Sequence, residues 1–178
     1  MAADDVVASD EADTEAPVEP APELHGCPLT ISHTQDVLHV PREKLLDVVK
    51  ALGADGYVQC VDVTAVDYLD YPADRALPDA IEPGRYEVVV SLIDHAERRR
   101  IRLRVQVPGE QPTCPSLFRL HPGTEALERE IFDLFGIVFD DHPDMTRVIM
   151  PEDWEGHPLR KDYSVGAIPV QFKDAPSR

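Results

Sequence analysis

The sequence is poor in cysteine, in basic residues and in long apolar runs, and each deficit excludes a class of protein. Its three cysteines, Cys27, Cys60 and Cys114, are odd in number and widely spaced, so neither a disulfide framework nor a CxxC metal motif is present. The longest apolar stretch, residues 88–93, is far below the ~18 residues of a membrane span. With 17 basic against 34 acidic residues and a net charge of −17, a nucleic-acid-binding role is disfavoured.

The N-terminus carries a disproportionate share of the acidic charge. Residues 1–23 contain eight Asp and Glu side chains and no Lys or Arg, with mainly Ala and Pro between them. Such a segment buries too little apolar surface to offset its ordering entropy, so residues 1–28 are predicted to be a disordered acidic tail. The alternative is an arm that binds a partner. No basic region followed by an apolar run begins the chain, so no signal peptide is expected.

Apolar residues at helical spacing predict two helices. The first begins near Pro41 and ends at Gly53, because Pro suits a first helical turn and Gly a helix end. The second runs from Thr124, a suitable N-cap, to Phe135, with Gly136 directly after its end. The apolar face of this second helix comprises Leu127, Ile131, Leu134 and Phe135.

β-Branched and alternating residues predict the strands. Residues 57–68 are expected to form one strand, and residues 146–150 a short one. Residues 85–94 and 98–107 are expected to form a hairpin, since apolar and polar side chains alternate strictly in its second half. The fold class is therefore α+β, a two-layer domain with helices on one face of a small mixed β-sheet.

Residues 29–140 are assigned to this domain, and residues 141–178 to a long irregular C-terminal extension. The extension contains five prolines, yet large apolar side chains recur along it. An irregular segment of this length is unusual inside a compact domain. It could wrap over its own domain or lie along another subunit, with its aromatic side chains as anchors.

The strand at residues 98–107 carries the densest basic cluster, with Arg98, Arg99, Arg100, Arg102 and Arg104. One interpretation is a solvated strand face that also discourages pairing with other sheets. The other is a charged face that meets an acidic partner or the chain's own acidic tail.

Residues with catalytic potential form no recognisable active site. Glu130 and Asp133, three apart on a helix, could meet as a carboxylate pair, but their helix face is expected to be exposed. His121, His142 and His157 fit no zinc motif, and three cysteines fall short of the four thiolates typical of an iron–sulfur cluster. Phosphate loops and a nucleophile elbow are absent. An interaction domain is favoured, with a metal-dependent hydrolase as the minority alternative.

The C-terminal half carries a specific pattern of charged, aromatic and turn residues: Glu128, Arg129, Glu130, Asp133, Phe135, Gly136, His142, Pro143, Asp144, Arg147, Trp154, Gly156, His157, Pro158, Arg160, Lys161, Asp162 and Tyr163. This pattern closely resembles the C subunit (thirty-kilodalton subunit) of proton-pumping NADH:quinone oxidoreductase, respiratory complex I. The resemblance covers about residues 30–178. The chain departs from the family pattern at two places. Members commonly carry an aromatic residue just before the Glu128-Arg129-Glu130 triplet, where this chain has Ala126-Leu127, and many carry a second basic residue before Arg147, where this chain has Thr146. Both departures bear on docking strength.

The resemblance implies a structural subunit of the peripheral arm that supports electron transfer from NADH to quinone, coupled to proton translocation. It implies no catalytic, cofactor-binding or metal site in this chain; FMN, iron–sulfur clusters and quinone are expected in partner subunits. The expected partners are the D (forty-nine-kilodalton) subunit and the B subunit, on the cytoplasmic side of the cell membrane. The patterned residues are then docking residues. The alternative within the superfamily is the equivalent subunit of a membrane-bound hydrogenase or reduced-F420 dehydrogenase complex.

Overall fold

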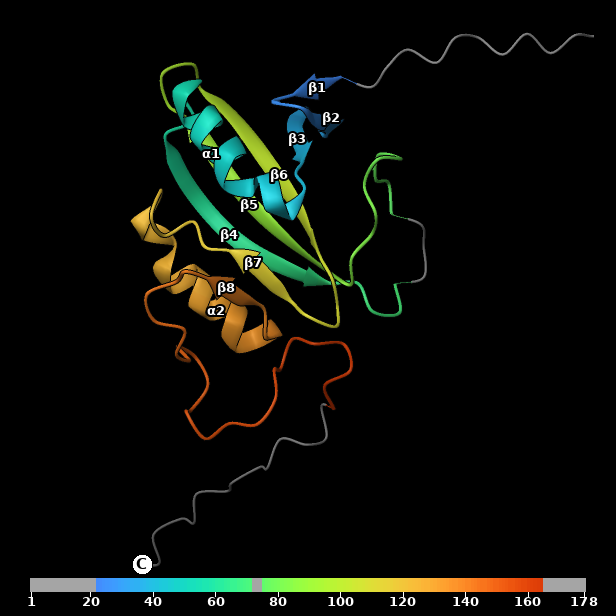
Figure 1. The fold of residues 1–178 in the computed structure, drawn as a ribbon, viewed down its shortest axis with the longest axis vertical. Helices are drawn as coiled ribbons and strands as arrows, with labels where there is room; N and C mark the ends of the chain where they lie inside the picture. The colour runs from blue at the N-terminus through green and yellow to red at the C-terminus, as the bar shows by residue number, and fades with distance from the viewer. Residues whose placement is uncertain (1–21, 72–74, 165–178) are drawn as a thin grey trace, which may run out of the picture.

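The computed structural model describes residues 22–71 and 75–164. Two α-helices and a six-stranded mixed sheet form its main body (Figure 1). The strand order is β1-β2-β3-β6-β5-β4, and within this sheet only β3 and β6 pair in parallel. This arrangement confirms the predicted α+β class with helices on one face of a small mixed sheet.

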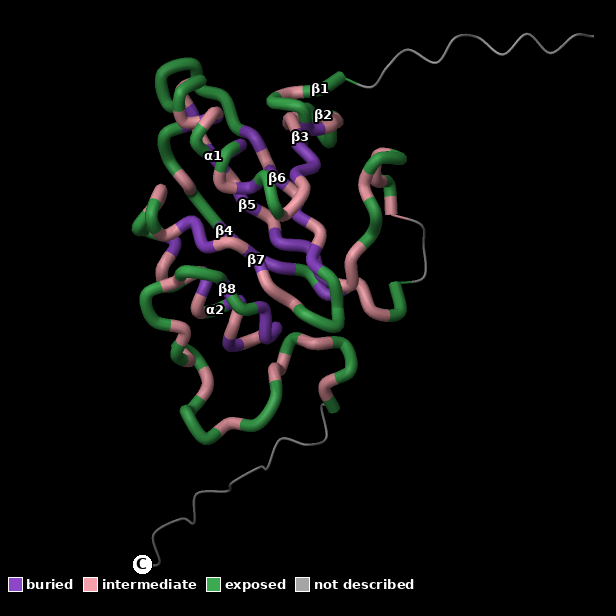
Figure 2. The backbone as a smooth tube through the Cα atoms, in the orientation of Figure 1, coloured by how far each residue is buried: buried purple, intermediate pink, exposed green. Residues whose placement is uncertain are grey.

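The central strands follow the predicted hairpin closely. β5 (Tyr86–Asp94) and β6 (Arg99–Val107) pair antiparallel along their whole length, and β4 (Gln59–Asp67) adds to β5 at the sheet edge. Alternate residues on one face of these strands are buried, because they meet the helices. Figure 2 shows this buried stretch running through the middle of the sheet.

The helices supply the second layer of the core. A short 3-10 turn, η1 (Arg42–Lys44), leads into α1 (Leu45–Ala54). The predicted end at Gly53 is wrong, since Gly53 lies inside α1 and the left-handed residue after the helix is Gly56, with φ 104°. A second 3-10 turn, η2 (Pro122–Thr124), precedes α2 (Glu125–Phe135), which ends at Gly136 with φ 75°, as predicted.

The sequence prediction missed a hairpin at the start of the domain. β1 (Glu23–Leu24), β2 (Cys27–Ser32) and β3 (Gln35–His39) form successive antiparallel pairs. Cys27 is fully buried, so folded structure begins before the predicted boundary at residue 29. The remainder of the predicted tail, residues 1–21, lies outside the described residues.

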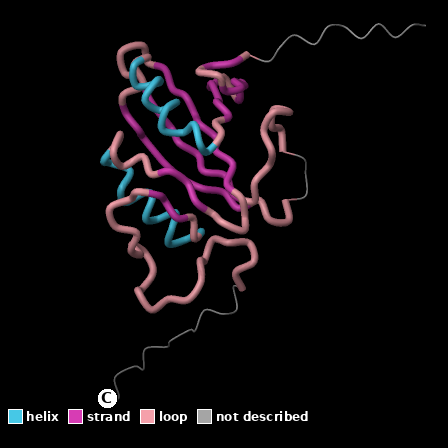
Figure 3. Tube along the Cα trace, in the orientation of Figure 1, coloured by secondary structure: helices cyan, strands magenta, loops and turns pink. Residues whose placement is uncertain are grey.

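Two short strands, β7 (Thr113–Pro115) and β8 (Val138–Asp140), form a separate parallel pair beside α2. After β8 the described chain is irregular to residue 164 (Figure 3). The predicted strand at residues 146–150 is wrong: the backbone N–H groups of Val148, Ile149 and Met150 all donate to one carboxylate oxygen, on Asp133.

Candidate docking surface

Asp133 on α2 is the centre of the patterned segment. It is fully buried, although its helix face was expected to be exposed. Its Oδ2 accepts from the N–H groups of Val148, Ile149 and Met150 at 3.1, 2.8 and 2.8 Å, and its Oδ1 lies 2.5 Å from Arg147 Nη1. Burial acts to raise the pKa of Asp133, but these donors outweigh it and hold the pKa below its ordinary value.

Arg147 extends this contact along the chain. Its Nη2 donates to the carbonyl oxygens of Trp154 and Gly156, at 2.9 Å each. The guanidinium of Arg147 therefore joins the buried carboxylate of Asp133 to the loop at residues 154–156. The segment 145–156 is shaped by a buried charge pair rather than by regular secondary structure.

The next residues satisfy the carbonyl groups at the end of α2. The last carbonyls of a helix have no partner within it. Here His157 Nδ1 donates to the Asp133 carbonyl at 2.9 Å, and the Leu159 N–H to the Leu134 carbonyl at 3.0 Å. Arg160 Nε donates to the Phe135 carbonyl at 2.5 Å. The extension thus caps the C-terminus of α2 from a distance in sequence.

Gly136 makes this cap possible. A Cβ at this position would overlap the guanidinium of Arg160 and the ring of His157.

The imidazole of His157 donates to the helix end in its neutral form. Burial, with the nearby Arg160 and Arg147, lowers the pKa of His157, so its imidazole is neutral at neutral pH and carries its proton on Nδ1.

A second anchor ties the extension to the ends of β4 and β5. Arg85 bridges the fully buried Asp67, at 3.0 Å, and Asp162, at 2.8 Å. The Lys161 N–H also donates to Asp67, at 2.9 Å. Burial acts to raise the pKa of Asp67, but its donors Arg85 and Lys161 lower it overall, and Arg85 likewise lowers the pKa of Asp162.

Glu128 serves the opposite end of α2. It is fully buried and accepts from Ser116 Oγ at 2.6 Å, the Leu117 N–H at 2.8 Å and Thr124 Oγ1 at 2.9 Å. The Thr124 hydroxyl, predicted to cap the helix backbone, is committed to Glu128 instead. Glu128 therefore fixes the segment after β7 against α2.

Arg129 and His142 hold the turn after β8. Arg129 donates to the Thr146 carbonyl and hydroxyl at 3.1 and 2.6 Å, and lies 3.8 Å from Asp144. His142 Nε2 donates to the Glu125 carbonyl at 3.1 Å, while its Nδ1 accepts from the Asp144 N–H. His142 therefore links the turn after β8 to the first turn of α2.

The remaining patterned residues divide between packing and exposure. Phe135 is buried, Trp154, Pro158 and Tyr163 are half-buried, and Glu130, Pro143, Gly156 and Lys161 are exposed. Glu130 and Asp133 form no catalytic pair in this arrangement, because Asp133 is saturated by its own donors while Glu130 points to solvent. Asp67 and Arg85 were missed by sequence reasoning, since neither belongs to the C-terminal pattern.

Three large apolar side chains of this framework are exposed. Val148, Ile149 and Leu159 are 48%, 55% and 49% exposed. Because the backbone of residues 148–150 turns its N–H groups inward to Asp133, the side chains of Val148 and Ile149 are held outward in a fixed loop. We call these three residues the apolar ridge.

The arginine-rich strand is largely engaged within the domain. Arg104 forms two hydrogen bonds with the buried Glu87, at 2.7 and 2.8 Å, and Arg99 pairs with Asp94 at 2.6 Å. Arg102 donates to the side-chain oxygen of Gln35 at 3.0 Å, an uncharged acceptor.

In residues 22–71 and 75–164, no helix is both long and apolar enough to cross a membrane. Within the same ranges, no group of three or more His, Cys, Asp or Glu side chains is placed to hold a metal ion.

Comparison with known proteins identifies clear relatives. The model of the family described as "Respiratory-chain NADH dehydrogenase, 30 Kd subunit" matches residues 38–168. The C subunit of NADH-quinone oxidoreductase from Saccharopolyspora erythraea is 39% identical over 150 residues, which cover 83% of this chain and 56% of that protein. The same-named protein of Mycolicibacterium paratuberculosis is 45% identical over 139 residues, covering 78% and 56%. The chain thus spans little more than half the length of these curated relatives.

Solved structures share the fold. The trypsin-resistant fragment (1–134) of Nqo5 superposes with a TM-score of 0.59 at 34% identity, covering 67% of this chain and 89% of that one. A chain of the membrane-bound sulfane sulfur reductase, an archaeal respiratory membrane complex, gives a TM-score of 0.65 at 21% identity, covering 85% and 89%. At that identity the second likeness concerns the fold alone.

Proposed function

The chain belongs to the family of the 30-kDa subunit of respiratory-chain NADH dehydrogenase, and from this premise we propose that it is a structural subunit of an NADH:quinone oxidoreductase. In this role it supports electron transfer from NADH to quinone, coupled to proton translocation, by holding neighbouring subunits in place. The observation that carries the proposal is the family match over residues 38–168, which includes most of the sheet, both helices and the described part of the extension.

The arrangement of the patterned residues supports a structural role. Asp133, Arg147, His157 and Arg160 use their polar atoms on one another and on the end of α2. Side chains so committed brace a surface rather than take part in a reaction. What they present outward is the apolar ridge, and exposed apolar side chains on a rigid support are typical of protein–protein contacts.

The partners follow from the same family. We propose that the ridge and the rest of the extension dock on the D subunit, and that the B subunit lies in the same assembly. FMN, the iron–sulfur clusters and the quinone would be bound by partner subunits, and this chain would lie on the cytoplasmic side of the membrane as a peripheral component. Electrons would therefore pass through neighbouring subunits, with this chain fixing their relative positions.

A deletion strain tests the proposal. Membranes lacking this chain should lose NADH:quinone activity and regain it when the chain is supplied, and an affinity tag on the chain should recover the other peripheral subunits. The proposal is wrong if the complex assembles and works normally without the chain.

A further inference from the structure

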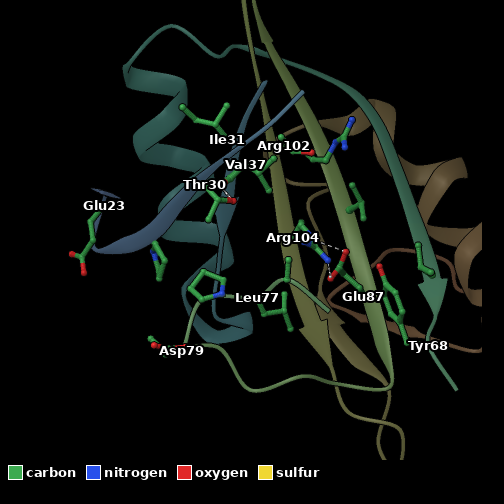
Figure 4. A pocket seen from close by; sticks show the side chains of 17 residues that line it. Glu23, Thr30, Ile31, Val37, Tyr68, Leu77, Asp79, Glu87, Arg102 and Arg104 are labelled. Carbon is green, nitrogen blue, oxygen red and sulfur yellow. Dashed lines mark hydrogen bonds and ion pairs between the residues drawn. The ribbon is translucent and has the colours of Figure 1, made fainter. Parts of the chain in front are cut away.

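A groove of about 930 Å³ lies on the open face of the sheet, away from the two helices. Its floor comes from β3, β4, β5 and β6, and its walls come from β2 and the segment 76–80 (Figure 4). Most of the lining is apolar, with Val37, Val66 and Val89 on the floor side and Leu77 and Pro78 on the wall.

Two arginines lie on the floor, and they differ in their partners. Arg104 is neutralised by the buried Glu87, which also accepts from Gln106. Arg102 is half-buried, and its partner among the described residues is the neutral side chain of Gln35. The hydrogen bond from Arg102 to Gln35 thus leaves the positive charge of Arg102 without a carboxylate partner among the described residues, and a carboxylate entering the groove could supply one.

The acidic side chains of the lining do not occupy this position. Figure 4 shows Glu23 and Asp79 at the margin, away from Arg102, while Glu87 faces Arg104. An occupant with apolar side chains and one well-placed carboxylate would complement the floor, whereas a strongly charged one would meet the marginal carboxylates.

The chain itself supplies such a segment at the groove's margin. Pro22 is fixed there, because its carbonyl accepts from the Leu29 N–H at 2.8 Å, and the next residue, Glu23, lines the groove. The preceding residues 15–21 read Glu-Ala-Pro-Val-Glu-Pro-Ala, with prolines at positions 17 and 20. This spacing favours a polyproline II conformation, which docks in grooves that offer an aromatic side chain, as Tyr68 does here.

The dimensions are compatible. At ~3.1 Å per residue in polyproline II, the seven residues from 15 to 21 span about 20 Å, roughly twice the ~10 Å edge of a cube of 930 Å³. Glu19 lies near the middle of that stretch and Glu15 at the end farther from Pro22, and no Lys or Arg occurs before residue 42. Glu19 is therefore the carboxylate placed to reach the floor.

We propose that residues 15–21 of this chain occupy the groove in an extended conformation, with Val18 on the apolar floor and Glu19 opposite Arg102. The acidic N-terminus is then an internal ligand of the open sheet face, and any partner that approaches this face must displace it. This contact is intramolecular and does not depend on the proposed function.

Paramagnetic relaxation in the full-length chain tests the contact. A spin label is placed by Val18→Cys in a Cys60→Ser background; Cys27 and Cys114 are fully buried and are not modified. Amide signals of Val37, Val89 and Arg102 should lose most of their intensity, while those of α1 on the opposite face keep theirs. Equal effects on both faces, or none on the groove, would overturn the proposal.

Charge variants make the test specific. Arg102→Glu should restore most of the lost groove signals, whereas Arg119→Glu, the same change at a side chain 77% exposed, should leave the broadening unchanged. An equal response to both variants, or broadening that appears only when labelled protein is mixed with unlabelled isotope-enriched protein, would contradict an intramolecular contact held by Arg102.

Discussion

The substitution Asp133→Asn tests whether one buried carboxylate organises the C-terminal extension. It leaves Arg147, whose side chain is 15% exposed, without its counter-ion, and removal of one partner from a buried pair costs ~3–5 kcal/mol. The new amide also cannot accept from three backbone N–H groups and the guanidinium at once, and a buried unsatisfied donor costs ~1–3 kcal/mol. These contributions share atoms and do not add, so we expect a total loss of ~3–5 kcal/mol in the free energy of unfolding.

Urea or thermal denaturation of the chain at neutral pH measures this loss. For a protein of this size, 1 kcal/mol shifts Tm by roughly 2–4 °C, so Tm should fall by about 6–20 °C. Glu130→Gln is the matched control, because it makes the same acid-to-amide change on the same helix at an exposed side chain; such surface changes stay within about 0.5 kcal/mol. If Asp133→Asn costs no more than Glu130→Gln, the carboxylate does not hold the extension and the reasoning fails.

Three further predictions concern the same region. Gly136→Ala should lower the free energy of unfolding by more than ~1 kcal/mol, because φ at this position is positive and the added methyl group overlaps the capping side chains. In the same denaturation assay the control Gly123→Ala, whose Cβ would have open space around it, should leave that free energy nearly unchanged. The double variant Val148→Ser and Ile149→Ser should keep its Tm within a few degrees but recover less of the partner subunits in a pull-down; unchanged recovery would remove the ridge from the interface. The pKa of Asp133 is depressed in the fold, so the stability that its carboxylate contributes is complete above the unfolded pKa of ~3.9 and is lost as pH falls through the folded pKa. Acidification should therefore lower the free energy of unfolding more in the wild type than in Asp133→Asn. Equal dependence of that free energy on pH in the two proteins would contradict this prediction.

The elements that sequence reasoning found are those with a long, regular pattern. The hairpin of β5 and β6 shows nine-residue strands with alternating burial, and α2 shows an apolar face closed by Gly136. In both cases local preference and tertiary burial agree, which is the condition under which a pattern can be read reliably.

The missed elements lack that agreement. The hairpin of β2 and β3 turns at His33 and Thr34, both with positive φ, where Asn-Gly is the usual signal. β7 and β8 have three residues each, too few to show a period. Residues 146–150 have strand-forming side chains, but the backbone N–H groups of residues 148–150 donate to the Asp133 carboxylate instead of to a neighbouring strand. A local sequence pattern cannot predict a hydrogen bond to a residue so distant in sequence.

The candidate site was located by its motif, but its geometry was not predictable. Asp133 was expected on an exposed helix face, whereas it and Glu128 are both fully buried because each finds several donors in another segment. Arg160 and Asp162 were predicted to dock on a partner; the structure adds contacts of both with their own domain, which the motif alone did not indicate.

The cap that residues 157–160 place on α2 also concerns how the chain is made. Synthesis proceeds from the N-terminus at ~5–20 residues per second, and the carbonyl groups of Asp133, Leu134 and Phe135 find their partners only when His157, Leu159 and Arg160 have left the ribosome. Until then these carbonyl groups at the end of α2 have no donor from the extension. Among the described residues, this cap is therefore one of the last contacts that can form during synthesis, because its donors follow every strand of the sheet in the chain.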